Sequence, residues 1–440
     1  MDSEIFKKYE NTGVIYAMEE AQKYGYDPLD KDWVNLGQGS AQGDEIKGSP
    51  KRVRNFCLGL DDHGYAPVSG LKELKQKVAV LYNELFRQNH RQKYQIKNIS
   101  IAGGGRIAIS RVVASMNKVK LGFFTPDYTA YEGIINVFEN VEPVGIRLND
   151  FQGFKPDLDE FEKTVKEKKI QAFLLSNPCN PTGNVIKGKD LKKLIRIAKK
   201  NNLFLILDEF YFNYIYTGSK GFVSSARYIS DIEREPILII AGLSKALRYS
   251  GWRICWCLGP SKVIRLISSV GSFLDGGANH PLQKEAVKLL NKENIVKESK
   301  AVGLVFKRKR DFIKSRLEKI GFLIKNKPEG AFYIWASLEN IRHLFKNDFD
   351  FFKQCLAKKV IVVPGSFFDI KGFKNLSKVK YSHYVRFSFG PDIKSIKEGM
   401  SRIEKLIKER EKITQNSSKW KLRSWKTLGQ KARAWRFESN

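Results

Sequence analysis

The sequence predicts an α/β fold with a large domain, in which helices cover a mainly parallel sheet, and a second, smaller α+β domain. Three observations lead to this prediction. Short apolar runs recur between about residues 98 and 260, amphipathic stretches separate them, and after about residue 298 Lys-rich amphipathic segments surround shorter strands. Continuous apolar strands that alternate with helices are typical of parallel sheets buried on both faces.

Seven apolar runs are the candidate strands of the large domain. In chain order they read NISIAGG, KLGFFTP, VEPVGIRL, IQAFLLSNP, LFLILDE, ILIIAGLS and RICWCLGP. The stretch 191–200 carries apolar residues at the i, i+3, i+4 and i+7 positions of a helix, beginning at Leu191. In such sheets ligands bind beyond the carboxyl ends of the strands, so the segments that follow the runs are candidate site segments. These segments are 103–106, 126–131, 177–183, 208–211 and 244–253.

The predicted domain boundaries follow the change in sequence texture. We expect a large domain over residues 46–298, and a small domain built from residues 1–45 together with 299–411. The predicted strands of the small domain are 331–335, 360–363 and 384–389. From Lys412 onward the chain is polar and carries eight Lys or Arg, one Glu and three Trp. We predict that this basic, Trp-containing tail, residues 412–440, is flexible.

The composition excludes several classes of protein. The 440 residues are 42% hydrophobic, which is enough to bury a large core. Five cysteines without framework spacing argue against a disulfide-stapled secreted protein, and Cys255 and Cys257 lack the further ligands that a metal site needs. No apolar run approaches the roughly 20 residues of a membrane span, and the first 30 residues show no signal peptide. We therefore expect a cytoplasmic protein with no metal and no membrane partner.

The net charge of +31, from 78 Lys and Arg against 47 Asp and Glu, predicts attraction to anions. Two hypotheses follow, an enzyme that handles anionic small molecules and a nucleic-acid binder. The Trp residues of the basic tail suit stacking on single strands. However, no helix-turn-helix or zinc module is evident, and many basic residues have Glu or Asp nearby. We favour the enzyme.

The segment GLSKALRYSGWR, residues 242–253, combines a lysine, a hydroxyl and an arginine. This combination suits a covalent aldehyde cofactor that carries a phosphate. Lys245 would form the Schiff base, while Ser244 and Arg253 would hold the phosphate dianion. Taken alone, Lys245 has another interpretation as one of many surface lysines on a basic protein.

Two further segments follow strand-like runs. In SNPCNPTG, residues 176–183, the prolines predict a rigid turn that leaves Asn180 as an inward donor. In LILDEFY, Asp208 ends an apolar strand, where a carboxylate is costly to bury unless it meets a cation or a donor. A protonated pyridine nitrogen would be such a partner, and Tyr211 could reach the same ring. The alternatives are a plain turn at Asn180 and a helix N-cap at Asp208.

These motifs also stand in a specific order. The succession P-x-[aromatic]-x-x-Y, N-P-x-N-P-T-G, D-E-x-Y, S-K-x7-R and a late R-x-S-F resembles the class I/II aminotransferases. These are pyridoxal-phosphate enzymes of the aspartate aminotransferase fold, fold type I. The resemblance covers about residues 35–406. It implies a seven-stranded large-domain sheet, a homodimer, and transfer of an amino group from an L-amino acid to a 2-oxo acid.

The resemblance also implies roles around the cofactor ring. Lys245 would form the Schiff base and move the proton between the substrate Cα and the cofactor. Asp208 would keep the pyridine nitrogen protonated, which makes the ring an electron sink. Asn180 and Tyr211 would donate hydrogen bonds to the ring phenolate, and Tyr128 would stack on the ring.

The cofactor phosphate would lie at the start of a helix. The backbone amides of Gly104, Gly105 and Arg106 would bind it, because free N–H groups and the helix dipole favour an anion. Ser244 and Arg253 would complete this cradle.

The resemblance further implies a substrate site. Arg386 would form a bidentate pair with the α-carboxylate, assisted by Asn180 and by the backbone around Gly37. Arg106 stands where some aspartate-using relatives carry a lysine, which suggests an acidic amino donor; the alternative is that it serves only the phosphate or faces solvent. Tyr65 matches a tyrosine that reaches the phosphate of the neighbouring subunit. PEGAFYIW and VPGSFF match small-domain elements that close over the substrate.

Two positions depart from the family pattern. Gly242 stands where many members have a serine on the phosphate, and Cys255 stands where a glycine is common. The reaction also has alternatives, since the same fold supports β-elimination (as in a C–S lyase), decarboxylation, racemisation or oxidation. A cofactor-binding regulator associated with nucleic acid is the remaining alternative.

Overall fold

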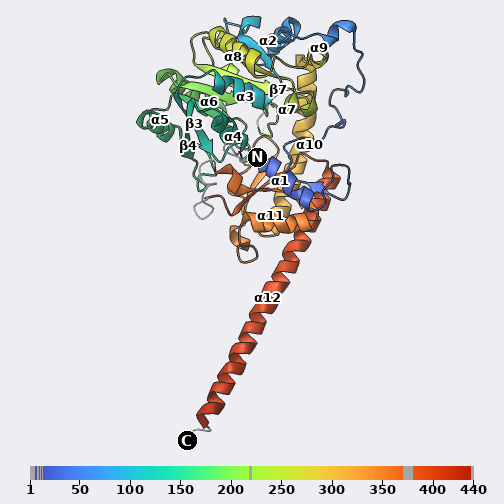
Figure 1. Ribbon diagram of the computed structural model, residues 1–440, viewed down its shortest axis with the longest axis vertical. Helices are drawn as coiled ribbons and strands as arrows, with labels where there is room; N and C mark the ends of the chain where they lie inside the picture. Colours follow the sequence, from blue (N-terminus) through green and yellow to red (C-terminus); the bar gives the residue numbers. More distant parts are fainter. Residues whose placement is uncertain are drawn as a thin grey trace.

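The computed structural model describes residues 5–6, 9, 11, 13–217, 221–369 and 380–437, with side chains as far as residue 416. In Figure 1 the large sheet and its helices lie at the top, the smaller sheets lie below them, and one long helix extends downward.

The seven predicted apolar runs form a single seven-stranded sheet. Its order is β2-β8-β7-β6-β5-β3-β4, and only β8 is antiparallel to its neighbours. The predicted α/β fold is confirmed. The strands are β2 (Ile99–Ala102), β3 (Val119–Thr125), β4 (Val141–Arg147), β5 (Ala172–Ser176), β6 (Phe204–Asp208), β7 (Ile237–Gly242) and β8 (Cys255–Leu258).

Two hydrophobic clusters cover the two faces of this sheet. Alternate residues of a strand enter different clusters: Leu174 belongs to one, while Phe173 and Leu175 belong to the other. The strands are therefore apolar on both sides, as the sequence predicts. One cluster includes α3 (Gly105–Ala114), α4 (Ala130–Val137) and α8 (Ser261–Leu274). The other includes α2 (Lys72–Phe86), α5 (Leu158–Glu167), α6 (Gly188–Lys200) and α9 (His280–Leu289).

The smaller part of the fold holds two short sheets. A three-stranded antiparallel sheet has the order β11-β12-β9, and a two-stranded parallel sheet pairs β1 with β10. The pairing of β1 with β10 joins the N-terminal segment to the C-terminal half of the chain. The elements are β1 (Val34–Asn35), β9 (Tyr333–Ser337), β10 (Val360–Ile361), β11 (Val363–Pro364), β12 (Tyr384–Ser388), α1 (Gly13–Lys23) and α11 (Asp348–Ala357).

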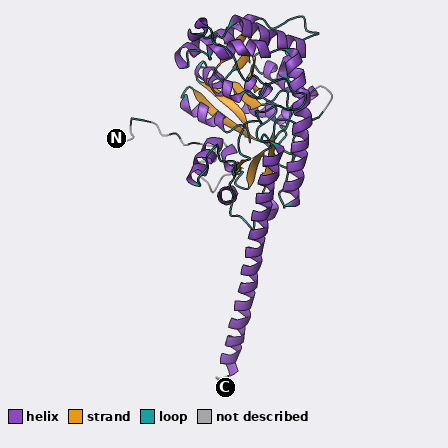
Figure 2. Cartoon of the chain, turned by 90° about the vertical axis from the view of Figure 1, so that its right-hand side faces the viewer, coloured by secondary structure: helices purple, strands orange, loops and turns teal. Residues whose placement is uncertain are grey.

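Two long helices cross the predicted boundaries. The boundary at residue 298 falls within α10 (Lys292–Lys319), and the boundary at residue 412 falls within α12 (Ile393–Phe437). The first turns of α12 pack into the core through buried residues such as Met400 and Ile403. The helix then continues beyond the body (Figures 1 and 2). Lys, Arg, Gln and Ala favour helices, so a packed helix can propagate into a segment without an apolar stripe. A helical backbone does not test the flexibility of the tail, which stays a prediction.

All five cysteines are unpaired. Of the helices that the structure describes, none is both long and apolar enough to cross a membrane.

Candidate active site

A cavity of about 510 Å³ lies at the carboxyl ends of the central strands β5, β6 and β7. This is the sheet edge at which the sequence analysis expects the ligand. Ten of the predicted site residues line it: Gly105, Arg106, Tyr128, Asn180, Asp208, Tyr211, Ser244, Lys245, Arg253 and Arg386.

Lys245 lies in the short helix α7 (Leu243–Ala246), which follows β7 directly. Its amine donates a hydrogen bond to the carbonyl of Gly39 and lies 5.4 Å from the centre of the Phe332 ring. Burial lowers the pKa of this amine to about 7, and the nearby charges of Arg386 and Arg253 contribute to this lowering. Much of the Lys245 population is therefore the uncharged, nucleophilic amine at neutral pH.

Asp208 ends β6 and is buried. The Tyr131 hydroxyl donates to Oδ2 at 2.8 Å, and the Phe210 N–H donates to Oδ1 at 3.3 Å. Burial raises the pKa of the carboxyl to about 6, and the hydrogen bond from Tyr131 opposes this rise. No helix begins at Asp208, so the N-cap alternative is wrong. The site contains a buried carboxylate that a cationic partner would stabilise.

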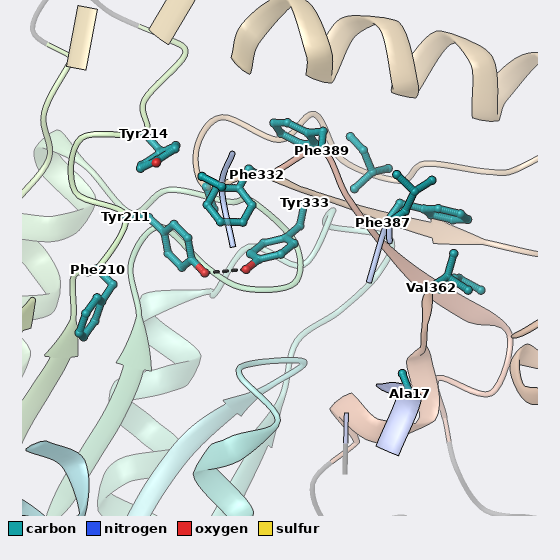
Figure 3. Close-up of a cluster of buried hydrophobic side chains, with 14 of the residues drawn as sticks. Ala17, Phe210, Tyr211, Tyr214, Phe332, Tyr333, Val362, Phe387 and Phe389 are labelled. Carbon is teal, nitrogen blue, oxygen red and sulfur yellow. Dashed lines mark hydrogen bonds between the residues drawn. The ribbon is translucent and has the colours of Figure 1, made fainter. Parts of the chain in front are cut away.

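Two tyrosine hydroxyls meet at one side of the cavity. The Tyr211 and Tyr333 hydroxyl oxygens are 2.7 Å apart (Figure 3). Burial raises the pKa of Tyr211 well above its ordinary value, so its hydroxyl stays a neutral hydrogen-bond donor. The sequence analysis marked PEGAFYIW as a closing element but did not single out Tyr333.

Arg386 is a buried cation on β12. Its Nη1 donates to Asn180 Oδ1 at 2.9 Å, and its Nη2 donates to the Gly37 carbonyl at 2.5 Å. The guanidinium lies 4.4 Å from the centre of the Tyr333 ring. Its buried Nε has no hydrogen-bond partner among the described residues. A buried guanidinium with an unused donor beside a cavity suits a carboxylate ligand.

A glycine cradle opens α3. Gly104 has a φ of +106°, which favours glycine, and the Arg253 guanidinium lies so close that any Cβ at Gly104 would collide with it. A Cβ at Gly105 would lie 2.7 Å from the Phe210 ring. Arg253 itself donates to the Ser250 carbonyl at 2.9 Å. The cradle thus sets a helix start beside a cation, which is an arrangement that binds phosphate. The N–H of Gly104 itself donates to the Ala102 carbonyl at 2.8 Å, so this predicted phosphate donor is already engaged.

Arg106 lies at the edge of the cavity. Its side chain is exposed, and its Nε donates to the Tyr128 hydroxyl at 3.3 Å. The side chain is therefore directed along the cavity edge by Tyr128.

Gly242 and Cys255, the two departures from the family pattern, pack against each other. They are directly opposite in the antiparallel pair of β7 and β8. A Cβ at Gly242 would lie 2.7 Å from the Cβ of Cys255. The two departures from the family pattern therefore occupy one site, which has room for one side chain. Burial raises the pKa of the Cys255 thiol to about 12, while a hydrogen bond from the Gly104 backbone lowers it, so the thiol is neutral and adjoins the cradle.

Tyr65 lies outside the cavity. Its side chain is fully exposed, with a relative accessibility of 100%. Within one chain the structure does not bring Tyr65 to the site. Gly37 and Gly104 also do not line the cavity, but they adjoin it through Arg386 and Arg253.

Several lining residues were missed by the sequence analysis. Four of them lie within motifs already singled out, and the others come from segments without a motif that reach the cavity through tertiary packing. These residues are Val14, Gln38, Gly39, Ser40, Ile109, Ser176, Phe210, Ser250 and Tyr333. The available signals were the positions of Ser176, Phe210, Ser250 and Tyr333 within named motifs, and the closeness of Gly39 and Ser40 to Gly37 in the sequence.

The family model for aminotransferase class I and II matches residues 31–403. The chain belongs to this family. Its members depend on pyridoxal phosphate, so the protein is a pyridoxal-phosphate-dependent aminotransferase, as predicted.

Individual relatives agree with this assignment. An aspartate aminotransferase of Pyrococcus abyssi is 29% identical over 86% of this chain and 93% of its own length. Aromatic-amino-acid aminotransferase 2 of Thermococcus litoralis is 26% identical over 86% of this chain and 93% of its own length. The structure of Thermus thermophilus aspartate aminotransferase with maleate superposes with a TM-score of 0.73 at 21% identity, covering 90% of this chain and 97% of that one. The predicted fold type is confirmed.

Proposed function

We propose that the cavity binds pyridoxal phosphate through Lys245 and transfers an amino group from an acidic L-amino acid to a 2-oxo acid. The observation that carries the proposal is the convergence of a neutral buried amine, a buried carboxylate and a buried guanidinium in one cavity. When bound, the cofactor supplies an electron sink that stabilises the carbanion formed at the substrate Cα.

The glycine cradle would hold the phosphate. The amides of Gly104, Gly105 and Arg106 lie at the start of α3, and Arg253 lies directly beside Gly104. Ser244 lines the same cavity and offers a hydroxyl. The Gly104 position supports this assignment, because a side chain there would displace the Arg253 guanidinium from the cradle.

Three side chains would orient the cofactor ring. Asp208 would hold a proton on the pyridine nitrogen, because burial leaves this carboxylate in need of a cation. Asn180 and Tyr211 line the cavity and offer donors for the ring oxygen. The Tyr128 ring lies at the cavity edge, where it could cover one face of the cofactor.

Arg386 would bind the α-carboxylate of the substrate. Asn180 and the Gly37 carbonyl orient two of its donors, and Nε is buried with no partner among the described residues. A carboxylate held there would present its Cα towards Lys245, which lines the same cavity. Lys245 would then take the Cα proton as a neutral amine.

The acidic donor is supported by the charge of the cavity. Arg106 lies at the rim, on the Tyr128 hydroxyl, in addition to the cations Arg253 and Arg386 within. The Thermus relative was solved with maleate, which is a dicarboxylate. The Thermococcus relative is named for aromatic substrates, so the donor requires a direct test.

Rates with aspartate, glutamate, alanine and phenylalanine should be compared in the wild type, in Arg106→Ala and in Arg234→Ala, whose side chain is 90% exposed. We expect Arg106→Ala to lose about tenfold in rate with the two acidic donors and little with the others. An equal loss with all four donors would contradict the role of Arg106. Measuring the 2-oxo acid and ammonia in the same reaction separates transamination from elimination.

The cofactor assignment has its own test. Purified protein reconstituted with pyridoxal phosphate should show a near-ultraviolet or violet absorbance band that shifts when an amino acid is added. Lys245→Ala should lack this band. A wild-type protein that shows no band after reconstitution would overturn the proposal.

We also propose a homodimer in which Tyr65 reaches the phosphate of the neighbouring site. Tyr65 is fully exposed, and the large apolar side chains of Leu60 and Phe273 are 91% and 87% exposed. A second copy of the chain would cover such groups. The large and small domain limits (46–298; 1–45 with 299–411) and a cytoplasmic location belong to the same proposal.

A further inference from the structure

Asp127 is a buried carboxyl that the proposed chemistry does not use. It precedes Tyr128, is 1% exposed and does not line the cavity. Its Oδ2 accepts the Ser176 N–H at 3.1 Å. Its Oδ1 accepts the Tyr128 N–H at 2.7 Å and also the Ser176 hydroxyl. Three donors therefore converge on one carboxyl group.

The hydrogen bonds continue from Ser176 to the substrate site. The Asn180 N–H donates to Ser176 Oγ at 3.1 Å, and Arg386 Nη1 donates to Asn180 Oδ1 at 2.9 Å. Asp127, Ser176, Asn180 and Arg386 are all buried. An unbroken hydrogen-bonded path thus joins a carboxyl behind the cavity wall to the guanidinium that faces the ligand.

We propose that Asp127 is a positioning residue that acts through Ser176 to hold Asn180, and through Asn180 the Arg386 guanidinium, in the orientation that binds the substrate carboxylate. This inference rests on the proposed function of Arg386. It assigns a role to Asp127, which the family resemblance did not assign and which does not line the cavity.

The hydroxyl of Ser176 explains why the path needs Asp127. A hydroxyl has one proton to donate and lone pairs to accept with. When the proton is committed to Asp127, a lone pair is directed at the Asn180 N–H. Without Asp127 the hydroxyl is free to rotate, and Asn180 loses a defined partner.

The position of Asp127 is costly for a carboxyl group. Burial raises its pKa to about 8, and the nearby Asp208 contributes to this rise, while the donors from Ser176 and Tyr128 oppose it. The three hydrogen bonds offset part of this cost.

Asp348 offers a matched control. It is also buried, and it also accepts a serine N–H, from Ser366 at 2.7 Å. Burial raises its pKa as well, to about 6. Neither Asp348 nor Ser366 lines the cavity. Asp348→Asn therefore removes the same kind of buried carboxyl group at a place that no hydrogen bond of the described residues links to Asn180 or Arg386. The turn that Asp348 holds contacts Arg386 only through the Phe368 ring, 5.4 Å from the guanidinium.

The test measures binding of succinate, a dicarboxylate without an amino group, to protein loaded with pyridoxal phosphate, followed by the cofactor absorbance. We expect Asp127→Asn and Ser176→Ala each to weaken succinate binding about tenfold. Asparagine at 127 sets its NH2 against the Ser176 N–H or, if flipped, against the Ser176 hydroxyl and the Tyr128 N–H, and alanine at 176 removes the acceptor of the Asn180 N–H. Asp348→Asn should change succinate binding less than about twofold. The double variant of Asp127 and Ser176 should bind no more weakly than the weaker-binding single variant, because both changes break the same path.

Several results would overturn the proposal. One is an affinity in Asp127→Asn equal to that in Asp348→Asn; another is an additive loss in the double variant. If Asp127→Asn does not fold, the succinate affinity of Ser176→Ala is compared with that of the wild type, and thermal unfolding checks that Ser176→Ala is folded. An affinity in Ser176→Ala equal to that of the wild type would then overturn the proposal. A wild-type protein that shows no cofactor band would instead overturn the proposed function, so the two failures are distinguishable.

Discussion

Gly242 and Cys255 face one another across β7 and β8, and only one of the two positions has room for a side chain. A Cβ at Gly242 would lie 2.7 Å from Cys255 Cβ and 2.8 Å from the Ile254 carbonyl oxygen. Cys255 adjoins the glycine cradle through a hydrogen bond from the Gly104 backbone. The close packing of β8 against Gly242 therefore leaves no room for the usual serine, and the Cys255 side chain supplies one of the close contacts, so the two positions are coupled.

Gly242→Ser should destabilise the protein by about 1–3 kcal/mol, as overpacking does, and weaken cofactor binding. Adding Cys255→Gly should recover part of both losses, since it removes the contact with the Cys255 Cβ and leaves two contacts with the backbone, at the Cα of residue 255 and the Ile254 carbonyl. Denaturant unfolding and cofactor titration measure the two effects. Adding Cys257→Ala instead, on the same strand, should recover neither stability nor cofactor binding. Equal recovery by Cys255→Gly and by Cys257→Ala would contradict the coupling of residues 242 and 255.

Attachment of the cofactor should depend on pH through Lys245. Burial and the charges of Arg386 and Arg253 lower the pKa of its amine to about 7. The neutral amine is the nucleophile, so the rate should rise with pH around a midpoint near 7 and then level off. Stopped-flow absorbance of cofactor-free protein mixed with pyridoxal phosphate measures this.

The same measurement on Arg386→Gln tests the cause. Removing this positive charge should move the midpoint to higher pH, because the protonated amine is then less strongly disfavoured. Arg106→Gln serves as a control of equal charge change. Midpoints that coincide in the wild type and Arg386→Gln would refute the assigned electrostatic cause.

Asp208 should reduce the stability of the cofactor-free protein at neutral pH. Burial raises its pKa from 3.8 to about 6, so in this window the folded state binds more protons than the unfolded state, and stability falls as pH rises. Asp208→Asn should raise the free energy of unfolding by up to about 3 kcal/mol above this window, with the gain vanishing below it.

Denaturant unfolding of wild type and Asp208→Asn across this window gives the difference directly. Asp61→Asn, at an exposed position, is the control and should show little change. Pyridoxal phosphate should raise the free energy of unfolding of the wild type by more than it raises that of Asp208→Asn. A variant that is less stable than wild type at every pH would contradict the desolvation argument.

A mixture of two inactive variants should recover activity if Tyr65 acts across a dimer. Lys245→Ala lacks the amine, and Tyr65→Ala lacks the exposed ring. A hybrid dimer contains one site in which the intact Lys245 of one chain meets the intact Tyr65 of the other. Recovery of activity after the two variants are unfolded and refolded together is the expected result. Mixing Lys245→Ala with Asp208→Asn should recover nothing, because these residues share one chain's site.

Much of the fold follows from local pattern. The seven apolar runs form the seven strands, since a strand buried on both faces leaves a continuous apolar signature. The segments after β5, β6 and β7 meet because parallel strands place their carboxyl ends at one edge. For this reason the amino-acid order alone is enough to place Lys245, Asp208 and Asn180 together.

Other features had no local signature. The contact of Lys245 with Gly39 and that of Tyr211 with Tyr333 join segments more than 100 residues apart. The helix of the tail also escaped prediction, because its continuation depends on the packed start of α12 rather than on an apolar stripe of its own.

The sequence by itself determined the family and the sheet, because these depend on the order of motifs and on the alternation of strands and helices. The +31 charge of the sequence, in contrast, did not indicate the site, because only a few of the 78 Lys and Arg residues line the cavity. Tertiary structure alone decided that Gly242 lies opposite Cys255 and that Ser176 links Asp127 to Asn180 by hydrogen bonds. It also decided that Tyr65 lies outside the cavity of its own chain. These relationships depend on distances between segments remote in sequence, and distances arise only from packing.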